Sequence, residues 1–301
     1  MIVYLKNQEI DREQWDNCIA ASPYVKPYAF SWYLDIMAPG WEALIDDDYD
    51  SVFPVPGFSR FGIQYISTPI FLQQLGAYSP DNPVDNVIHE FIDYMPEFYK
   101  FIDLCVGQKV DCKGFNVTER VNHELDLSAP YDKLWSGFTQ HCCRNIQTAS
   151  KRKIELTSEI TPEELTNVFV RNKGAEIKGI KQRDYNNLIS LMYYCLSFSK
   201  GRIIGVRSKG GRLICGIFLI EVPGRITTLF VVNSPESRED RVGYYLLNEL
   251  IRDRARSGLK LDFAGSSIPS VASYNESFGA VRIPYYRIYR NHLPWPVRML
   301  K

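Results

Sequence analysis

The chain has 301 residues, of which 45% are hydrophobic and 23% are charged, as expected for a globular protein with one large domain or two of ordinary size. No apolar run reaches 18 residues and the N-terminus lacks the pattern of a signal peptide, so we expect a cytoplasmic protein without a membrane span. Seven cysteines without a CxxC spacing favour reduced thiols over a zinc site, and no metal is expected.

Charge is divided unevenly along the chain, although the formal net charge is zero. Residues 1–100 carry a net charge of −10, and residues 101–301 carry +10. The basic part is suited to a polyanionic ligand such as a nucleotide, coenzyme A or RNA. The alternative is that the two parts neutralise each other across an interface.

The first part of the chain predicts a mixed unit of strands and helices. A strand is expected at residues 1–5, and Asp11 is a good N-cap for the first helix, with Gln14 completing a capping-box-like pattern. Further strands are expected at 41–45, 51–55, 61–68, 98–105, 115–121 and 124–127, and further helices at 30–37 and 83–95.

A long connecting helix is expected next. Residues 131–153 show an apolar face with the spacing of a helix, so we expect domains at 1–130 and 152–301, joined by a helix at 131–151. Each domain then shows a similar order of elements, which indicates a weak internal repeat.

The second part begins with a helix whose start is well marked, because Thr161 is an N-cap and Pro162 follows it. Asp184 is expected to cap a second helix, at 185–198, and Ser270 a later one. Three strands joined by glycine-rich turns form an antiparallel meander at 201–206, 213–222 and 225–232. Short strands are also expected at 259–263 and 285–289.

The stretch 225–280 carries the functional argument. It reads as strand, turn, helix, strand and helix, and Gly243 opens the first of these helices. A strand that leads into such a helix presents free backbone N–H groups and a positive dipole end to an anion.

This order of elements resembles the GNAT acyltransferase fold, and nearly the full chain resembles the FemABX-like group, in which two GNAT-like domains occur in tandem. The expected fold class is α/β (α+β), with mixed, mostly antiparallel sheets flanked by helices. The segments that carry the resemblance are Trp135 with Arg144-Asn145-Ile146 and Ala149, then residues 243–247, and finally 261–266 with 277–280 and 284–286.

The resemblance implies a bacterial enzyme that forms an amide bond by direct acyl transfer to an amine. The best-known members of the group move an amino acid from aminoacyl-tRNA to a peptidoglycan precursor, and other relatives use acyl-CoA or an acyl carrier. The resemblance therefore does not decide whether the donor is aminoacyl-tRNA, acyl-CoA or an acyl carrier. It implies that the acceptor is a small molecule or a peptidoglycan precursor. A catalytically inactive scaffold or binding protein is the alternative.

Part of a phosphate-binding loop precedes the helix at Gly243. In GNAT enzymes a Gln/Arg-x-x-Gly-x-Gly/Ala loop wraps a pyrophosphate, and the resemblance assigns Arg238, Arg241 and Gly243 to it. Tyr245 stands where a small residue is usual, and Glu239 and Asp240 oppose an anion. An ordinary capped helix is the alternative.

Asp262, Ser266 and Tyr274 are candidates for the chemical step, and Tyr245 and Asn275 are assigned with the cofactor-binding residues. Asp262, at the end of a buried strand, is suited to orient or deprotonate the attacking amine, or else to pair with a neighbouring strand. Ser266 is suited to position the acyl carbonyl. The resemblance places a proton-donating Tyr four residues before Gly279, where this chain has Asn275, with Tyr274 as its neighbour. Core packing is the alternative for Tyr274.

Basic residues, among them Arg144, Lys151 and Arg287, are candidates for a phosphate path or RNA contact. The function classes differ in what they predict for the space beside residues 225–232. If the protein is an enzyme, we expect the strands beside residues 225–232 to splay apart and leave an empty polar cleft. If it is an inactive scaffold, we expect Tyr245 and Tyr274 to fill that space.

Overall fold

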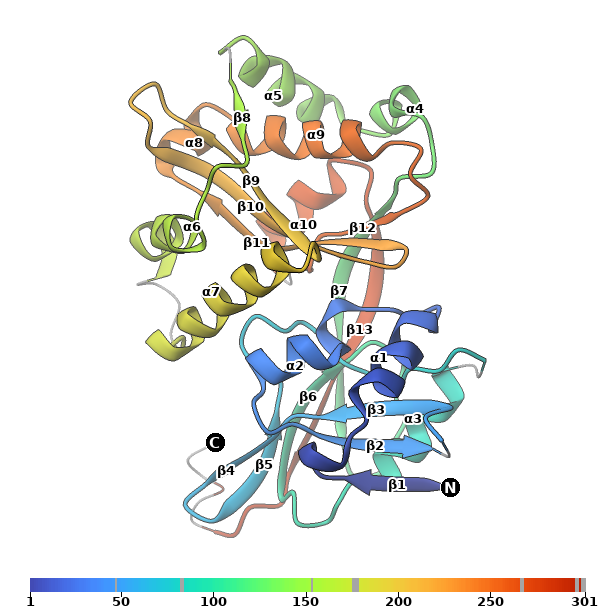
Figure 1. Cartoon of the computed structure of the whole chain (residues 1–301). Helices are drawn as coiled ribbons and strands as arrows, with labels where there is room; N and C mark the ends of the chain where they lie inside the picture. The colour runs from blue at the N-terminus through green and yellow to red at the C-terminus, as the bar shows by residue number, and fades with distance from the viewer. Residues whose placement is uncertain are drawn as a thin grey trace. The chain divides into compact units, whose positions relative to one another are not determined.

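The computed structural model describes residues 1–46, 48–81, 84–152, 154–174, 179–265, 268–295 and 298. Its contacts group the chain into two compact units (Figure 1). Unit 1 contains Met1–Val121 and Pro284–Lys301, and unit 2 contains Asn122–Ile283. The segment expected as a connector, residues 131–151, therefore has its contacts within unit 2, while most of the last strand belongs with unit 1.

Unit 1 contains an antiparallel three-stranded sheet and a second group of strands. The first sheet consists of β1 (Ile2–Leu5), β2 (Glu42–Asp46) and β3 (Ser51–Val55). The second group, in spatial order, is β4 (Gly57–Arg60), β5 (Ile63–Ser67), β6 (Phe101–Val106), the end of β13 (Val281–Asn291) and the first part of β7 (Asn116–Asp126). The pair β5 and β6 is parallel, and the pairs β4 with β5 and β6 with β13 are antiparallel. The helices are α1 (Arg12–Ala21), α2 (Ser31–Met37) and α3 (Val84–Asp93), with short 3₁₀ turns at Asn7–Glu9 and Pro27–Ala29.

The predicted start of α1 is confirmed. The Asp11 carboxylate accepts hydrogen bonds from the backbone N–H groups of Glu13 and Gln14, and the Gln14 side chain donates back to it. These bonds satisfy donors that a helix start otherwise leaves free. The helix then buries Trp15 against Trp41, with ring centroids 4.7 Å apart, in the core of unit 1.

Unit 2 is a mixed sheet with helices on both faces. Its strands, in spatial order, are the end of β7 (Asn116–Asp126), β12 (Lys260–Asp262), β11 (Arg225–Asn233), β10 (Leu213–Val222), β9 (Gly201–Arg207) and β8 (Leu156–Thr157). Only the pair β11 and β12 is parallel. The predicted meander is confirmed as β9, β10 and β11. The helices are α4 (Tyr131–Ser136), α5 (Gln140–Ser150), α6 (Pro162–Phe169), α7 (Gln182–Ser197), α8 (Pro235–Glu239), α9 (Val242–Arg254) and α10 (Pro269–Glu276), with a π-helical turn at Val170–Gly174.

Three local expectations in unit 2 are wrong. The single helix at 131–153 is two helices, because α4 ends at Ser136 and Thr139 caps a new helix by accepting from Cys142 N. Asp184 lies in the first turn of α7, where its carboxylate accepts from the N–H of Lys181, the residue at the N-cap. Ser270 is likewise inside α10, because that helix already begins at Pro269.

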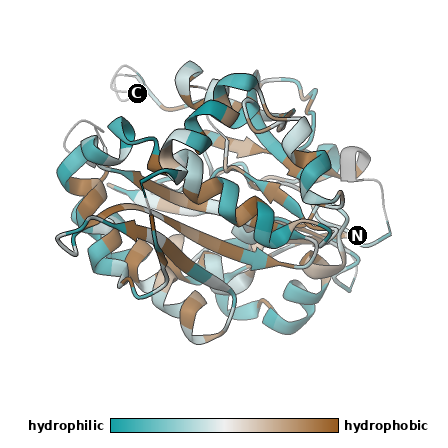
Figure 2. Cartoon of the chain, turned by 90° about the horizontal axis from the view of Figure 1, so that it is seen from above, coloured by the Kyte–Doolittle hydropathy of each residue, from teal (hydrophilic) through white to brown (hydrophobic). Residues whose placement is uncertain are grey.

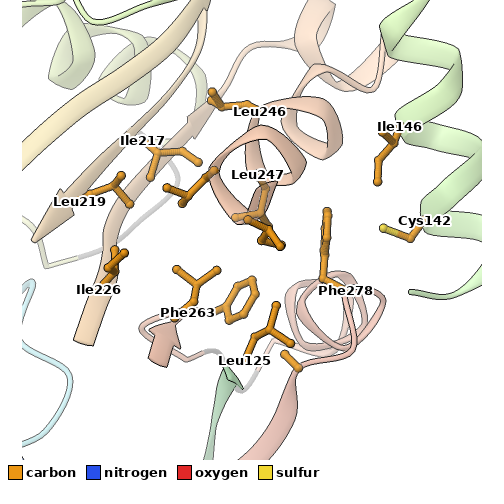
Figure 3. Close-up of a cluster of buried hydrophobic side chains, with 14 of the residues drawn as sticks. Leu125, Cys142, Ile146, Ile217, Leu219, Ile226, Leu246, Leu247, Phe263 and Phe278 are labelled. Atoms are coloured by element: carbon orange, nitrogen blue, oxygen red, sulfur yellow. The ribbon is translucent and has the colours of Figure 1, made fainter. Parts of the chain in front are cut away.

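The two faces of the unit 2 sheet follow from alternation along β10. Ile217 and Leu219 belong to the cluster that Figure 3 shows with Leu246 and Leu247 of α9. On the other face, a Cβ at Gly216 would lie 2.5 Å from Leu165 Cδ1 of α6, so the helix approaches the strand too closely for a larger residue. Figure 2 shows that hydrophobic residues are concentrated in the strands and that the helices carry more hydrophilic residues. Alternation thus explains why α9 and α6 lie on opposite faces.

No helix within the described ranges is both long and apolar enough to cross a membrane.

Candidate functional site

An open cleft lies where β11 and β12 part. The two strands pair only from Arg225 with Lys260 to Thr227 with Asp262, although β11 continues to Asn233. A cleft of about 410 Å³ opens beyond that point, within unit 2. The residues that line it are Val168, Phe169, Asn172, Ile217, Thr228, Val231, Val232, Asn233, Ser237, Arg238, Arg241, Gly243, Tyr244, Leu247, Phe263, Ser270, Val271, Tyr274 and Asn275.

A β-bulge shapes the wall that β11 gives to this cleft. Phe218 of β10 pairs with Phe230 and Leu219 pairs with Thr228, so Leu229 is an extra residue in β11. A bulge leaves one residue unpaired, bends the strand and redirects its neighbours, and bulges are common beside active sites. The bulge and the short pairing with β12 together produce the splay expected of an enzyme. The cleft is not the purely polar one that was expected, because eight of its lining residues are apolar, and Tyr274 lines it.

The charge in the cleft is positive. Arg238 and Arg241 line it, and the described lining residues include no Asp, Glu, His, Lys or Cys. Asp240, expected to oppose an anion, instead pairs with Arg152 at 2.9 Å, and Glu239 is exposed away from the lining. The two guanidinium groups are therefore well placed for an anionic ligand.

Gly243 lies at the start of α9, as predicted, and the surrounding polar atoms hold that start in place. A Cβ at Gly243 would lie 2.8 Å from Asn233 Oδ1, which accepts a hydrogen bond from Ser237 Oγ. The Gly243 carbonyl accepts a hydrogen bond from the Tyr274 hydroxyl at 2.9 Å. Arg241, at the N-cap, adopts a left-handed conformation with φ of 61°. A larger residue at position 243 would therefore displace the Asn233 side chain of β11 from its bond with Ser237, and the helix start faces the cleft.

Aromatic rings form one wall. The rings of Tyr244 and Tyr274 meet edge to face with centroids 4.7 Å apart, and Tyr244 stacks on Phe278. Burial raises the pKa of Tyr274 well above its usual value, so this hydroxyl keeps its proton at neutral pH. Tyr245 does not line the cleft, so the expected obstruction by this side chain is absent and its neighbour Tyr244 is the lining residue.

Replacing Tyr274 with Phe should lower the free energy of unfolding by about 1 kcal/mol, because the hydrogen bond to the Gly243 carbonyl is lost while the ring is kept. Urea denaturation measures this change. Turnover of any acyl donor should stay within a few-fold of the wild type, since the hydroxyl serves the start of α9. A loss in turnover of about 100-fold with unchanged stability would instead support the proton-donor role that the family resemblance implies.

Asn275 is the most unusual polar residue of the cleft. It is 3% exposed, and its side-chain Nδ2 has no hydrogen-bond partner in the described part of the chain. Buried amides are nearly always paired, so this donor, in a residue of the cleft wall, is a candidate for a hydrogen bond to a ligand or to an ordered water.

Asp262 lies outside the lining of the cleft, in a buried ionic cluster that ties three strands together. Its carboxylate accepts from Arg225 Nη1 at 2.9 Å, from Asn122 Nδ2 at 2.9 Å and from the backbone N–H of Ala264 at 2.9 Å. Arg225 also donates to Glu124 at 2.6 Å. β12 lies between β7 and β11, so both neighbours reach Asp262, as its alternative role of pairing with neighbouring strands predicts. Ser266 lies outside the described residues.

The three residues proposed for a phosphate path do not come together at the cleft. Arg144 and Lys151 are exposed and do not line it, because α5 turns Cys142, Ile146 and Ala149 inward. Arg287 belongs to unit 1, where its guanidinium binds Asp103 in a two-point ion pair of 2.6 and 2.7 Å.

Sequence reasoning missed the wall that α6 and the π-helical turn provide. Val168, Phe169 and Asn172 line the cleft, and Phe169 packs on Phe230 with ring centroids 4.7 Å apart. The apolar spacing of 165, 168 and 169 marks one face of a helix, but it does not show which strand that face meets.

A thiol nucleophile is also disfavoured at the helix that carries His141 and two cysteines. Burial raises the pKa of the Cys142 thiol to about 12, so little thiolate forms at neutral pH.

No family model matches this chain, and no curated protein matches it. Solved structures do. FemX has 12% identity and a TM-score of 0.65, with 97% of this chain and 98% of FemX covered. A conserved protein of unknown function from Bacteroides thetaiotaomicron has 12% identity and a TM-score of 0.63, with 96% and 99% covered. The C-terminal domain of a putative lysylphosphatidylglycerol synthetase from Agrobacterium fabrum has 9% identity and a TM-score of 0.58, with 93% and 91% covered. The chain therefore has the fold of FemX, which agrees with the fold that the resemblance to the FemABX-like group implies.

Proposed function

We propose that unit 2 is an acyltransferase that takes an acyl group from an anionic donor and passes it directly to an amine. The observation that carries this proposal is the cleft at the parting of β11 and β12, which two arginines line and to which no described acidic residue contributes. A splay of this kind gives an extended donor access to the middle of a sheet that is otherwise closed.

The donor would be held by its phosphate groups. Arg238, Arg241 and the N–H groups of the first turn of α9 supply charge and hydrogen-bond donors at one end of the cleft. A coenzyme A thioester, the phosphopantetheine arm of a carrier and the end of a tRNA all present phosphate groups. The acceptor would be an amine of a small molecule or of a peptidoglycan precursor, as the resemblance implies.

The reaction would proceed by attack of a neutral amine on the acyl carbonyl. As the bond forms, negative charge grows on the carbonyl oxygen, and backbone N–H groups at the bulge in β11 are the proposed stabilising donors. The bond from the carbonyl carbon to the sulfur or oxygen of the donor then breaks, and the leaving group takes up the proton that the new amide nitrogen loses. The described lining offers no carboxylate or imidazole to take the proton, so the amine would lose it to water before attack. In this proposal Asp262 is a positioning residue, which fixes β12 and thereby Phe263 in the cleft wall.

The test is an assay of the whole chain with acyl-CoA thioesters and a set of amine acceptors. Release of free thiol that depends on the amine, with the amide product seen by mass spectrometry, is the expected result. Donor binding without turnover across all acceptors would favour the inactive scaffold. If acyl-CoA and acyl-adenosine analogues both fail to bind, the proposed function is wrong.

A further inference from the structure

The walls of the cleft are much more apolar than a phosphate site requires. Besides the two arginines, Gly243 and eight uncharged polar residues, the lining includes eight apolar residues, which are Val168, Phe169, Ile217, Val231, Val232, Leu247, Phe263 and Val271. A phosphate or a ribose would gain nothing from these side chains, whereas an acyl chain would bury its methylene groups against them.

The charge of the cleft argues against a cationic acyl group. An aminoacyl group carries an ammonium, which needs a carboxylate or several acceptors when it is removed from water. The described lining offers no carboxylate, its side-chain acceptors are neutral hydroxyl and amide oxygens, and two of its residues are arginines. An ammonium there would lose hydration and meet like charge.

The unpaired amide of Asn275 specifies a second property of the ligand. Its Nδ2 is a buried donor without a partner among the described residues, in a wall that is otherwise largely apolar. An acceptor atom on the ligand, such as an acyl oxygen, would remove the penalty of leaving that donor unpaired.

We infer that the group transferred in this cleft is an uncharged, largely apolar acyl chain, and that Asn275 donates a hydrogen bond to an oxygen of that acyl group. This inference rests on the proposed function, and it decides between acyl and aminoacyl donors. Asn275 is a specificity-determining residue in this assignment. It stands where the family resemblance places a proton-donating Tyr.

Butyryl-CoA and β-alanyl-CoA form a matched pair of probes, because a methyl group in one replaces an ammonium in the other. Isothermal titration of the full chain should show binding of butyryl-CoA at least about 30-fold tighter. Affinity should also rise about fourfold per added methylene from acetyl-CoA onward, until the cleft is filled. The same two acyl groups on 3′-amino-3′-deoxyadenosine, a minimal stand-in for the end of a tRNA, repeat the comparison on another carrier.

Asn275→Leu should weaken butyryl-CoA binding about fivefold to tenfold, because one hydrogen bond to the acyl group is lost. The melting temperature of the free protein should stay level or rise, since an unpaired polar group becomes apolar. Asn248→Leu is the matched control. Asn248 is also buried, but it accepts from Tyr131 and donates to Glu249, so this change should lower the melting temperature and leave acyl preference unchanged.

Three results separate the possibilities. Equal or tighter binding of β-alanyl-CoA, or affinity that does not change with chain length, overturns the inference and leaves the acyltransferase proposal standing. A lowered melting temperature for Asn275→Leu with unchanged affinity makes Asn275 a structural residue and overturns its assignment. Failure of both carriers with every acyl group contradicts the proposed function itself.

Discussion

Arg225→Met should lower the free energy of unfolding by about 3–5 kcal/mol, the cost of removing one partner from a buried ionic cluster. The guanidinium contacts both Glu124 and Asp262, and the side chains of all three residues are less than 10% exposed. Methionine keeps most of the length of the side chain. The decrease in the free energy of unfolding therefore comes mainly from the lost charge and less from lost packing. Urea denaturation followed by circular dichroism measures it.

Arg202→Met is the control for this change. Arg202 also contacts two carboxylates, those of Glu221 and Asp253, but it is 34% exposed and its partners are open to solvent. Exposed pairs contribute at most about 1 kcal/mol, so the control should be nearly neutral. Similar losses for the two variants would contradict a special role for the buried cluster.

The same cluster tests whether Asp262 takes part in chemistry. Asp262→Asn and Glu124→Gln each remove one carboxylate from the contacts of Arg225. If Asp262 only positions β12, the two variants should lose stability and turnover to a similar degree. If Asp262 handles the proton of the amine, its variant should lose far more turnover, about 100-fold beyond the effect of Glu124→Gln.

The elements that could be predicted from sequence are those whose signals are local. Asp11 and Thr161 begin helices because capping chemistry acts within three or four residues, and the glycine-rich turns set the meander of β9, β10 and β11. The break after α4 was missed because the apolar face continues through Gly137. A periodic pattern shows a shared face, but it does not show where a cap such as Thr139 starts a new helix.

The site was only partly predictable because its decisive contacts join distant segments. Arg238, Arg241, Gly243, Tyr274 and Asn275 were all expected at the cleft and all line it. The partners of Asp262 come from residues 122 and 225, so its burial leaves no signal near it in the chain. Tyr244 and Tyr245 are adjacent on one helix, about 100° apart, and only the packing of α9 decides which of them faces the ligand.

Arg238→Gln and Arg241→Gln made together should weaken binding of an acyl-CoA donor by about 100-fold to 1,000-fold, since hydrogen bonds from charged groups to phosphate are roughly twice as strong as neutral ones. Binding should also become less sensitive to salt, because less of it is electrostatic. Titration at low and high ionic strength measures both effects. Arg212→Gln is the control, because Arg212 pairs with Glu236 at 2.6 Å and does not line the cleft.

The double arginine variant and Asn275→Leu are expected to act on different parts of one donor. The arginines would hold the phosphate end and Asn275 the acyl end, so their effects on binding free energy should add within about 0.5 kcal/mol. The arginine variant should also keep part of its preference for butyryl over β-alanyl groups, because the apolar walls remain although the repulsion between the arginines and the ammonium is removed. If the double arginine variant loses the preference for butyryl over β-alanyl groups, the positive charge of the arginines rejects the ammonium, and the apolar lining does not. In that case the length of the acyl chain should have little effect on binding.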